Sequence, residues 1–399
     1  MRESSILLVG LSGLGCELAK NLALAGVGSL TLMDSASVVA DRDLSANFFL
    51  NESTSVGRNR AAESVAGVSV LNPNVRVESD ARSILSVVQS SPEFLMRFAA
   101  VILVGQTLPT VVAVNKALRE QGRAAAEAVQ AFATASAAGA SAAGSMSDSS
   151  PSSPPQPPPA FFAAEVCGLF GWFLSDLQCR AYTETKKAKD AAGRETEEEV
   201  IVAGVASFPT SAAELLTQEC AGASSYAAQS KKFGRRKQEK SAHSLWMALR
   251  VVLTWRETRP RGLDGSIVMP IALQDSLGEA RAAFAAREGV PAAVLDTVLP
   301  LSLLVDVAVC SGVDLAHICA IVGGILGQEV LKVISGKDQP LTNTFVYSAT
   351  VRQTNTTEAA RGGTRGGADN SDNSEAARAD WFWMCVCVSQ DGYGLIKEL

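Results

Sequence analysis

The fold is decided by the stretch Leu7-Leu8-Val9-Gly10-Leu11-Ser12-Gly13-Leu14-Gly15-Cys16-Glu17-Leu18. It contains an apolar run, a glycine-rich turn and the start of an amphipathic segment. A glycine turn between a strand and a helix lets the backbone approach phosphates, and it directs free N–H groups and the positive end of the helix dipole at them. The stretch therefore predicts a nucleotide-binding Rossmann unit.

The spacing of these glycines is not that of the dinucleotide-binding fingerprint, G-x-G-x-x-G/A. Gly10, Gly13 and Gly15 give the spacing G-x-x-G-x-G instead. Asp34 follows the second apolar run, at about the position where an acidic residue binds a ribose hydroxyl in this architecture. An ordinary turn or N-cap residue could also be an aspartate at this position. Ribose binding and a structural role for Asp34 therefore both stay open.

The first 122 residues alternate short apolar runs with helix-length amphipathic stretches, which is typical of a doubly wound parallel sheet. The predicted fold class is therefore α/β. Strands are expected at 6–9, 30–33, 75–78 and 101–104, and helices at 16–25, 57–71 and 109–121.

Composition divides the chain into ordered blocks and insertions. An Ala/Ser-rich stretch leads into the proline-rich segment Ser149–Pro159, and segments of this kind bury too little apolar surface to fold. We predict a Rossmann-like half at 1–123, a disordered insertion at 124–160, strands plus a charged insertion at 161–241, the rest of the fold at 242–353, a second low-complexity insertion at 354–380, and a terminal strand at 381–399.

Within these blocks, Phe161–Leu177 predicts two strands hinged at glycines, and Val200–Val205 a further strand. Helices are expected from Ser244 to Arg256, over 273–287 and, strongly apolar, over 315–334.

Composition also argues against several functions. The net charge of −6 and the acidic pI of about 5.2 do not favour a nucleic-acid binder. The eight cysteines form no C-x-x-C pair and only two histidines are present, so no metal site is predicted. No signal peptide precedes the first strand, and the apolar runs are shorter than the ~20 residues of a membrane span, so no membrane association is predicted.

Residues beyond the turn carry a resemblance to a family. Leu7–Val27 is similar to the opening of the ThiF-like enzymes that activate ubiquitin-like modifiers, and the resemblance is greatest to the smaller, regulatory subunits of SUMO-activating enzymes. Further similar blocks are Ser55-Val56-Gly57-Arg58-Asn59-Arg60-Ala61, Leu71-Asn72-Pro73, Phe161–Leu177, Ile318–Lys332 and Gly392–Ile396.

The resemblance implies a reaction in which ATP adenylates the modifier's C-terminal carboxylate and a cysteine then takes the acyl group as a thioester. Catalytic members carry an arginine where this chain has Ala46, and an acid where it has Gln106. Their nucleotide lysine corresponds to Arg60. Cys179 and Cys220 lack the surrounding motif of a thioester cysteine, so no catalytic residue is predicted in this chain.

These departures imply a degenerate half of a heterodimer. The expected partners are a larger catalytic subunit, which would bind ATP and Mg²⁺, and a SUMO-type modifier. Gly10, Gly13, Gly15, Asp34 and Arg60 would form a vestigial nucleotide site. Relatives also contribute an arginine in trans from a segment before the first strand, and Met1 lies after that position.

Gly323, Gly324 and Gly327 would permit close helix packing. That packing is expected either in the shared subunit interface or within this chain.

Several other features of the sequence have more than one interpretation. The basic run Lys231–Lys240 is either a nuclear localisation signal or solvated loop charge, and with the family it predicts a nuclear and cytoplasmic protein. His317 is expected to be an interface or core residue, and Trp381 and Trp383 to lie in a half-buried strand. The Arg-Gly-Gly repeats at 361–367 are too few to predict RNA binding.

Two alternative functions remain at this stage. One is the regulatory subunit of another ubiquitin-like activating enzyme, suggested by Asn47–Leu50 and Phe345–Ser348. The other is a nicotinamide-dependent oxidoreductase, which only the bare Rossmann pattern favours.

Overall fold

The computed structural model describes most of the chain outside the insertions. The described residues are 1–38, 40–141, 155–189, 195–208, 211–217, 237–260, 269–341, 344–349, 384–389 and 392–395.

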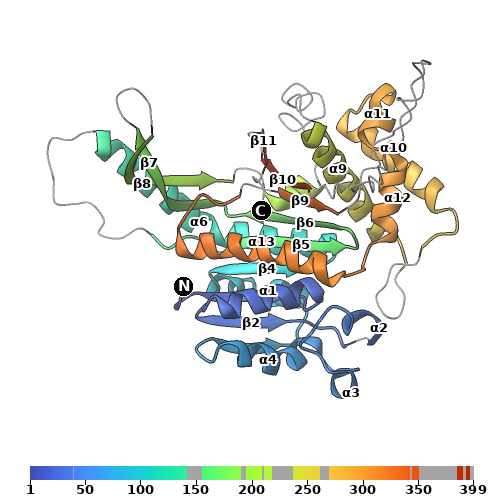
Figure 1. The fold of residues 1–399 in the computed structure, drawn as a ribbon, viewed down its shortest axis with the longest axis horizontal. Helices are drawn as coiled ribbons and strands as arrows, with labels where there is room; N and C mark the ends of the chain where they lie inside the picture. The colour runs from blue at the N-terminus through green and yellow to red at the C-terminus, as the bar shows by residue number, and fades with distance from the viewer. Residues whose placement is uncertain are drawn as a thin grey trace, which may run out of the picture.

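In this part of the chain a nine-stranded sheet runs through the molecule in the order β11-β10-β9-β6-β5-β4-β1-β2-β3 (Figure 1). Its strands are β1 (Ser5–Val9), β2 (Ser29–Met33), β3 (Arg76–Asp80), β4 (Ala100–Val104), β5 (Ala160–Cys167), β6 (Phe170–Asp176), β9 (Thr344–Ser348), β10 (Met384–Ser389) and β11 (Gly392–Leu395).

Two kinds of pairing make up this sheet. Strands β3, β2, β1, β4 and β5 pair in parallel, which confirms the α/β Rossmann-like prediction. Strands β6, β9, β10 and β11 extend it with antiparallel pairs. The antiparallel half was not predicted, although the hinge between β5 and β6 was. A separate hairpin pairs β7 (Cys179–Lys189) with β8 (Glu195–Ser207), and it takes up much of the expected charged insertion.

Each face of the sheet has its own apolar core, because side chains alternate along each strand. In β1, Ile6 and Leu8 join the core under α1 (Gly13–Leu24), α4 (Arg60–Leu71) and α13 (Ala316–Ser335), while Leu7 and Val9 join the opposite core. Figure 1 shows α1 and α13 side by side over the strands. The opposite face is covered mainly by α5 (Ile84–Ser90), α6 (Leu108–Ser141), α9 (Lys237–Glu257), α10 (Leu273–Glu288) and α12 (Leu301–Val309).

Shorter elements connect these layers. They are α2 (Ala40–Asp43), α3 (Glu52–Ser55), the 3₁₀ turn η1 (Pro92–Arg97), α7 (Ala212–Thr217) and α11 (Ala292–Val298).

Two predictions about the insertions need correction. Helix α6 does not end near 121 but continues to Ser141, so the loop expected from residue 124 begins as helix. The physical reason is that alanine has the highest helix propensity, so an Ala-rich extension prolongs an existing helix. Helix α9 likewise begins at Lys237, inside the polar stretch expected to reach 241. Residues 142–154, 218–236 and 350–383 lie outside the described residues.

Helix α13 has 20 residues, as many as the apolar helix predicted over 315–334. Its 20 residues meet the length and hydropathy of a membrane span, which contradicts the prediction that the apolar segments are too short. The helix nevertheless packs on α1, β5 and β6. Half of its most apolar window is buried inside the chain, and all of its large apolar residues are buried or half-buried.

The turn after β1 requires glycine at two positions. Gly10 has a φ of +94°, and a Cβ built there would lie 2.2 Å from the carbonyl oxygen of Val104. A Cβ on Gly15 would lie 2.0 Å from the carbonyl oxygen of Gly10. Both obstacles are backbone atoms, so they cannot rotate away. The turn is therefore fixed by backbone packing between β1, β4 and α1.

This geometry predicts that Gly15→Ala destabilises the chain by roughly 1–3 kcal/mol or more through overpacking. The matched control is Gly278→Ala in α10, where nothing lies within 4 Å of the added methyl group. The control should be neutral or stabilising by up to ~1 kcal/mol, because alanine is the better helix former. Urea unfolding of both variants measures the difference, and equal midpoints would contradict the backbone constraint.

Candidate functional site

The glycine turn lies where the direction of strand order reverses. Strand β1 pairs with β2 on one side and with β4 on the other, so its carboxyl end is the switch point of the parallel sheet. Ligands of open α/β sheets bind in the crevice at this point. The predicted residues Gly10, Gly13, Gly15, Asp34 and Arg60 all belong to this region.

Side chains of the same molecule form hydrogen bonds with the backbone of the turn. The Leu11 N–H donates to Asp34 Oδ2 over 2.7 Å, and the Gly13 N–H donates to Asp314 Oδ2, also over 2.7 Å. Asn47 donates through Nδ2 to the Leu11 carbonyl at 2.8 Å. The donors that a phosphate would need at the start of α1 therefore already have carboxylate acceptors.

Arg60 is buried between two carboxylates. Its Nε and Nη2 atoms each lie 2.8 Å from Asp34 Oδ2, and its Nη1 lies 2.8 Å from Asp43 Oδ1. Burial alone would lower the pKa of Arg60, yet the charges and hydrogen bonds of Asp34 and Asp43 raise it above its usual value. The predicted ribose acid and the predicted phosphate cation thus form an internal ion pair.

Asp314 adds a further carboxylate beside the turn. Burial raises the pKa of this residue above its ordinary value, while hydrogen bonds from the Ser12 hydroxyl and the Gly13 N–H act in the opposite direction. Asp34 and Asp43 contact the buried guanidinium of Arg60, and Asp314 is close enough to feel its charge, so three carboxylates lie in this region with one arginine. A polyanion such as a triphosphate would meet like charges here.

The space in front of the turn is also filled. A Cβ on Gly13 would lie 2.6 Å from Ala46 Cβ, 3.2 Å from Cys319 Sγ and 3.3 Å from Asp314 Cβ. Gln106, at the position of the family's acid, donates from Nε2 to the Val104 carbonyl at 3.1 Å. Among the described residues, no group of three His, Cys, Asp or Glu side chains is placed to hold a metal ion. The residues around this turn do not fit ATP or Mg²⁺.

Sequence reasoning missed three members of this cluster. Asp43 and Asn47 lie close to Ala46, but nothing in their spacing marks them as partners of the turn. Asp314 is 301 residues from Gly13. It precedes the apolar helix α13, whose packing on α1 brings it to the turn. Only the tertiary fold shows this contact.

The three glycines of α13 have different surroundings. A Cβ on Gly323 would lie 3.0 Å from Glu17 Cβ, and one on Gly327 would lie 3.4 Å from Asn21 Cβ, so both face α1 of the same chain. Asn21 also donates from Nδ2 to the Gly323 carbonyl at 3.1 Å. The close packing that these two glycines permit is therefore within the chain. Nothing lies within 4 Å of a Cβ on Gly324, and its interface role stays a prediction.

Four of the described cysteines are buried thiols: Cys16, Cys167, Cys179 and Cys319. Burial raises the pKa of Cys16 to about 12 and also raises the pKa values of Cys167, Cys179 and Cys319. Thiols of this kind are poor nucleophiles at neutral pH. Cys179 donates to Gln130 Oε1 at 3.1 Å. Cys220, Trp381 and Trp383 lie outside the described residues, and His317 is exposed on α13 rather than in the core.

A ThiF-type Rossmann fold is thus combined with a glycine turn that its own carboxylates satisfy. The model of the ThiF family matches residues 1–365, and the chain belongs to this family.

Among individual proteins, the chain is similar to SUMO-activating enzyme subunit 1 of Xenopus tropicalis, with 27% identity over 361 residues and 87% of each chain covered. The human protein of the same name is 28% identical over 359 residues, covering 87% of this chain and 86% of its own length. The protein of that name from Dictyostelium discoideum is 36% identical over 120 residues, which cover 30% of this chain and 35% of that protein.

The Arg60 cluster predicts a structural role that can be measured. Arg60→Met would leave Asp34 and Asp43 without their buried cation, and breaking a buried ion pair in this way costs about 3–5 kcal/mol. The control is Arg58→Met, because the Arg58 side chain is 67% exposed and lies 3.6 Å from Glu63. The control should change the free energy of unfolding by less than ~0.5 kcal/mol. Small and equal losses in urea unfolding would show that Arg60 is not structural.

The thiol environments predict selective protection from alkylation. In the native chain at mildly alkaline pH, iodoacetamide should leave Cys16, Cys167 and Cys319 unmodified, because they are buried and their pKa values are raised. The same cysteines should react in concentrated urea, which serves as the control. Peptide mass spectrometry after a timed reaction distinguishes the two states. Rapid native labelling of these sites would contradict the described burial.

Proposed function

We propose that this chain is the regulatory subunit of a heterodimeric SUMO-type activating enzyme and that its larger partner performs the adenylation and the thioester transfer. The observation that carries the proposal is the glycine turn, whose N–H groups are bound by Asp34 and Asp314. A fold with a nucleotide turn closed in this way supports a structural role better than a catalytic one. The proposed pathway, activation of a SUMO-type modifier, is based on the names of the similar proteins.

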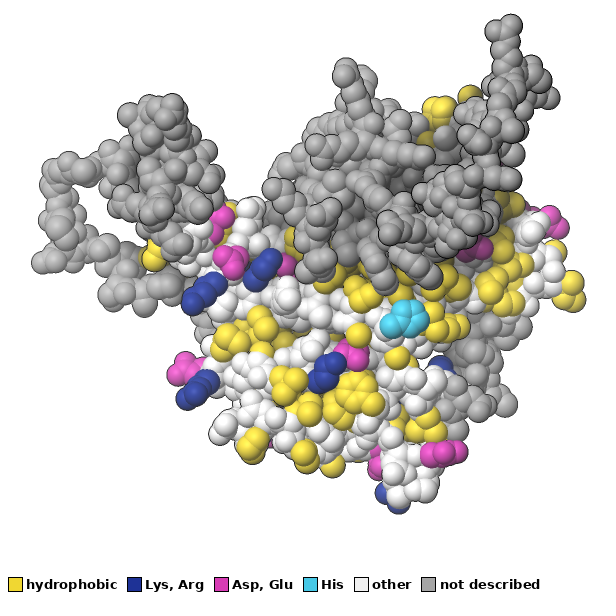
Figure 2. All heavy atoms as spheres, in the orientation of Figure 1, with side chains coloured by type: hydrophobic (Ala, Val, Ile, Leu, Met, Phe, Trp, Pro, Cys, Tyr) yellow, Lys and Arg dark blue, Asp and Glu magenta, His cyan; other side chains and the backbone are white. Residues whose placement is uncertain are grey.

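An apolar surface supports the pairing with a partner. The exposed residues of helix α13 are small or polar, among them Ala316 and His317, and three of its larger apolar residues are only half-buried: Ile321, Leu331 and Ile334. On neighbouring elements Leu24 is 58% exposed and Phe48 is 53% exposed. Figure 2 shows apolar side chains gathered on the face that carries α1 and α13. Exposed apolar side chains that gather on one face mark candidate protein–protein interfaces.

The partner that we propose is a larger catalytic subunit of the same family, which binds ATP and Mg²⁺ and carries the reactive cysteine. Proteins usually hold Mg²⁺ through one or two carboxylates and the phosphates of the substrate, and at the family's acid position this chain has the neutral amide Gln106. Within the pair, this chain would stabilise the fold of the partner and form one side of the interface.

The nucleus and the cytoplasm are the proposed locations. They are proposed on the basis of the basic run 231–240, most of which lies outside the described residues.

Of the two alternative functions, the oxidoreductase and the regulatory subunit for another modifier, only the second is compatible with the family. Membership of the ThiF family argues against a nicotinamide oxidoreductase. A regulatory subunit for a different ubiquitin-like modifier remains an outcome of the experiment below.

The test uses the chain alone and co-expressed with its larger partner. ATP–pyrophosphate exchange that depends on a SUMO-type modifier should occur with the pair and not with the chain alone.

A variant at the proposed interface tests the pairing itself. Gly324→Arg adds a long side chain where nothing lies within 4 Å in this chain, and Gly278→Arg is the matched control on α10. Both should fold, but only Gly324→Arg should weaken the heterodimer, by roughly tenfold or more, because a charged side chain would be buried in an apolar contact.

Three results would contradict the proposal. The first is exchange by the isolated chain, which would mean that it is a catalyst itself. The second is exchange by the pair that responds to another ubiquitin-like modifier and not to SUMO, which would keep the subunit role but change the pathway. The third is the failure of the chain to co-purify with any larger ThiF-type subunit.

A further inference from the structure

A cavity of about 530 Å³ opens at the edge of the fold opposite the glycine turn. Its wall includes Ala99, which precedes β4, Pro159, which precedes β5, and Ser335 at the end of α13. These positions lie at the amino ends of the parallel strands, whereas the turn follows the carboxyl end of β1. The cavity is therefore a separate site.

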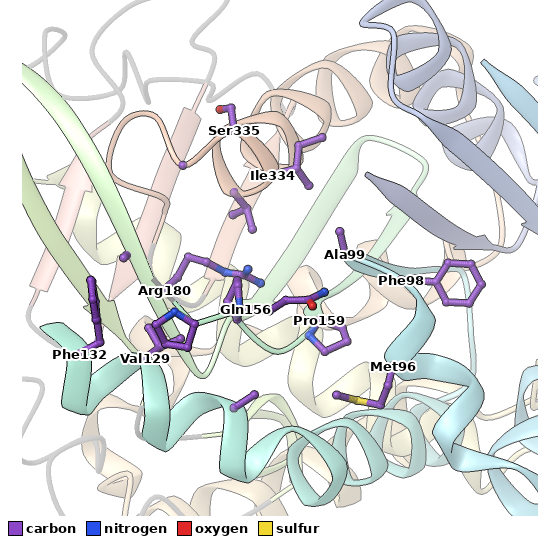
Figure 3. Close-up of a pocket in the computed structure, with 16 residues that line it drawn as sticks. Met96, Phe98, Ala99, Val129, Phe132, Gln156, Pro159, Arg180, Ile334 and Ser335 are labelled. Atoms are coloured by element: carbon purple, nitrogen blue, oxygen red, sulfur yellow. The ribbon is translucent and has the colours of Figure 1, made fainter. Parts of the chain in front are cut away.

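The cavity contains one charged side chain, Arg180, on β7 (Figure 3). Figure 3 shows it extending from β7 towards Gln156, between α6 and the end of α13. The residue is only 6% exposed. Its Nη2 donates to the Pro158 carbonyl at 2.7 Å, while its Nε is buried with no hydrogen-bond partner among the described residues.

The lack of a carboxylate partner among the described residues distinguishes Arg180 from the other buried arginines. Of the other buried arginines that the structure describes, Arg60, Arg250 and Arg256 each form an ion pair with a carboxylate at 2.8 Å or less. None of the residues that line the cavity is acidic. Burial lowers the pKa of Arg180 to about 10, and no carboxylate offsets this effect. A buried cation without a counterion is costly, and a bound anion would supply the charge partner that Arg180 lacks among the described residues.

The rest of the wall defines the body of the ligand. Val129 and Phe132 of α6 line one side, Met96 another, and Ile334 of α13 a third. The volume is within the range of small-molecule sites, which are mostly apolar with a few placed polar groups. A guanidinium presents a planar fork of donors that matches carboxylate and phosphate oxygens, and the Gln156 amide lies next to it.

We propose that this cavity binds a small organic anion, with a carboxylate or phosphate head on Arg180 and an apolar body against α6 and the end of α13. The site does not depend on the proposed role in modifier activation. The head group is recognised by charge and hydrogen bonding, and the body by burial of apolar surface. Neither the anionic head nor the apolar body of the ligand would bind firmly alone. The guanidinium of Arg180 needs an oxyanion, and the rest of the wall offers few polar groups.

The test is isothermal titration calorimetry of the full chain with four probes: octanoate, octyl phosphate, octanol and inorganic phosphate. Octanoate or octyl phosphate should bind, and octanol and inorganic phosphate should bind at least roughly tenfold more weakly, because charged hydrogen bonds and apolar burial both contribute. The comparison of octanoate with octyl phosphate identifies the preferred head group.

Two variants assign the site. Arg180→Met keeps the size of the side chain but removes the charge, and it should weaken anion binding by roughly tenfold or more without lowering the thermal midpoint of the free chain. Ala125→Phe fills the cavity from α6 and should also abolish binding. Ala128→Phe, on the same helix but exposed, should bind as the wild type does.

The proposal is overturned if neither amphiphilic anion binds, or if Arg180→Met and Ala125→Phe both bind like the wild type. It is also overturned if octanol binds as tightly as octanoate. If Arg180→Met does not fold, Ala125→Phe against Ala128→Phe decides the outcome alone.

Discussion

The structure depends on a carboxylate that serves two elements at once. Asp34, at the end of β2, accepts the Leu11 N–H of the glycine turn and binds the guanidinium of Arg60. In a nucleotide-binding Rossmann protein the corresponding acid faces a ribose hydroxyl. Here its charge is used inside the protein to hold β1, β2 and α4 together. Because the cluster is buried, loss of Arg60 would leave the carboxylates of Asp34 and Asp43 without their cation.

Asp314 completes this arrangement from a distant part of the chain. It accepts the Gly13 N–H at the start of α1, where the helix dipole favours an anion. Its position is set by α13, which packs on α1 through Gly323 and Gly327. The same helix fills the core under β5 and β6. One element therefore both builds the core and closes the inherited nucleotide turn, which is consistent with a subunit that contributes structure rather than chemistry.

Much of the fold could be predicted from the sequence because it rests on local patterns. The apolar period and the glycine turn identified β1, α1, β2 and β4, and the losses at Ala46 and Gln106 indicated that the site was degenerate. The contacts that close the turn could not be predicted, since Asp314 reaches Gly13 only through helix packing. The Ala-rich end of α6 was assigned to a disordered insertion because composition does not separate a helix extension from a linker. The cavity around Arg180 left no sequence signal at all, because its walls come from five separate stretches of chain.

The central claim is that the chain itself satisfies the N–H groups of the glycine turn. Amide hydrogen exchange of the segment 6–18 in the isolated chain, with and without ATP and Mg²⁺, tests this most directly. The account predicts strong protection of Leu11 and Gly13 without nucleotide and no change when ATP is added, because both amides already donate to carboxylates. Fast exchange without nucleotide that slows in the presence of ATP would contradict it, since the turn would then be an open and functional nucleotide site.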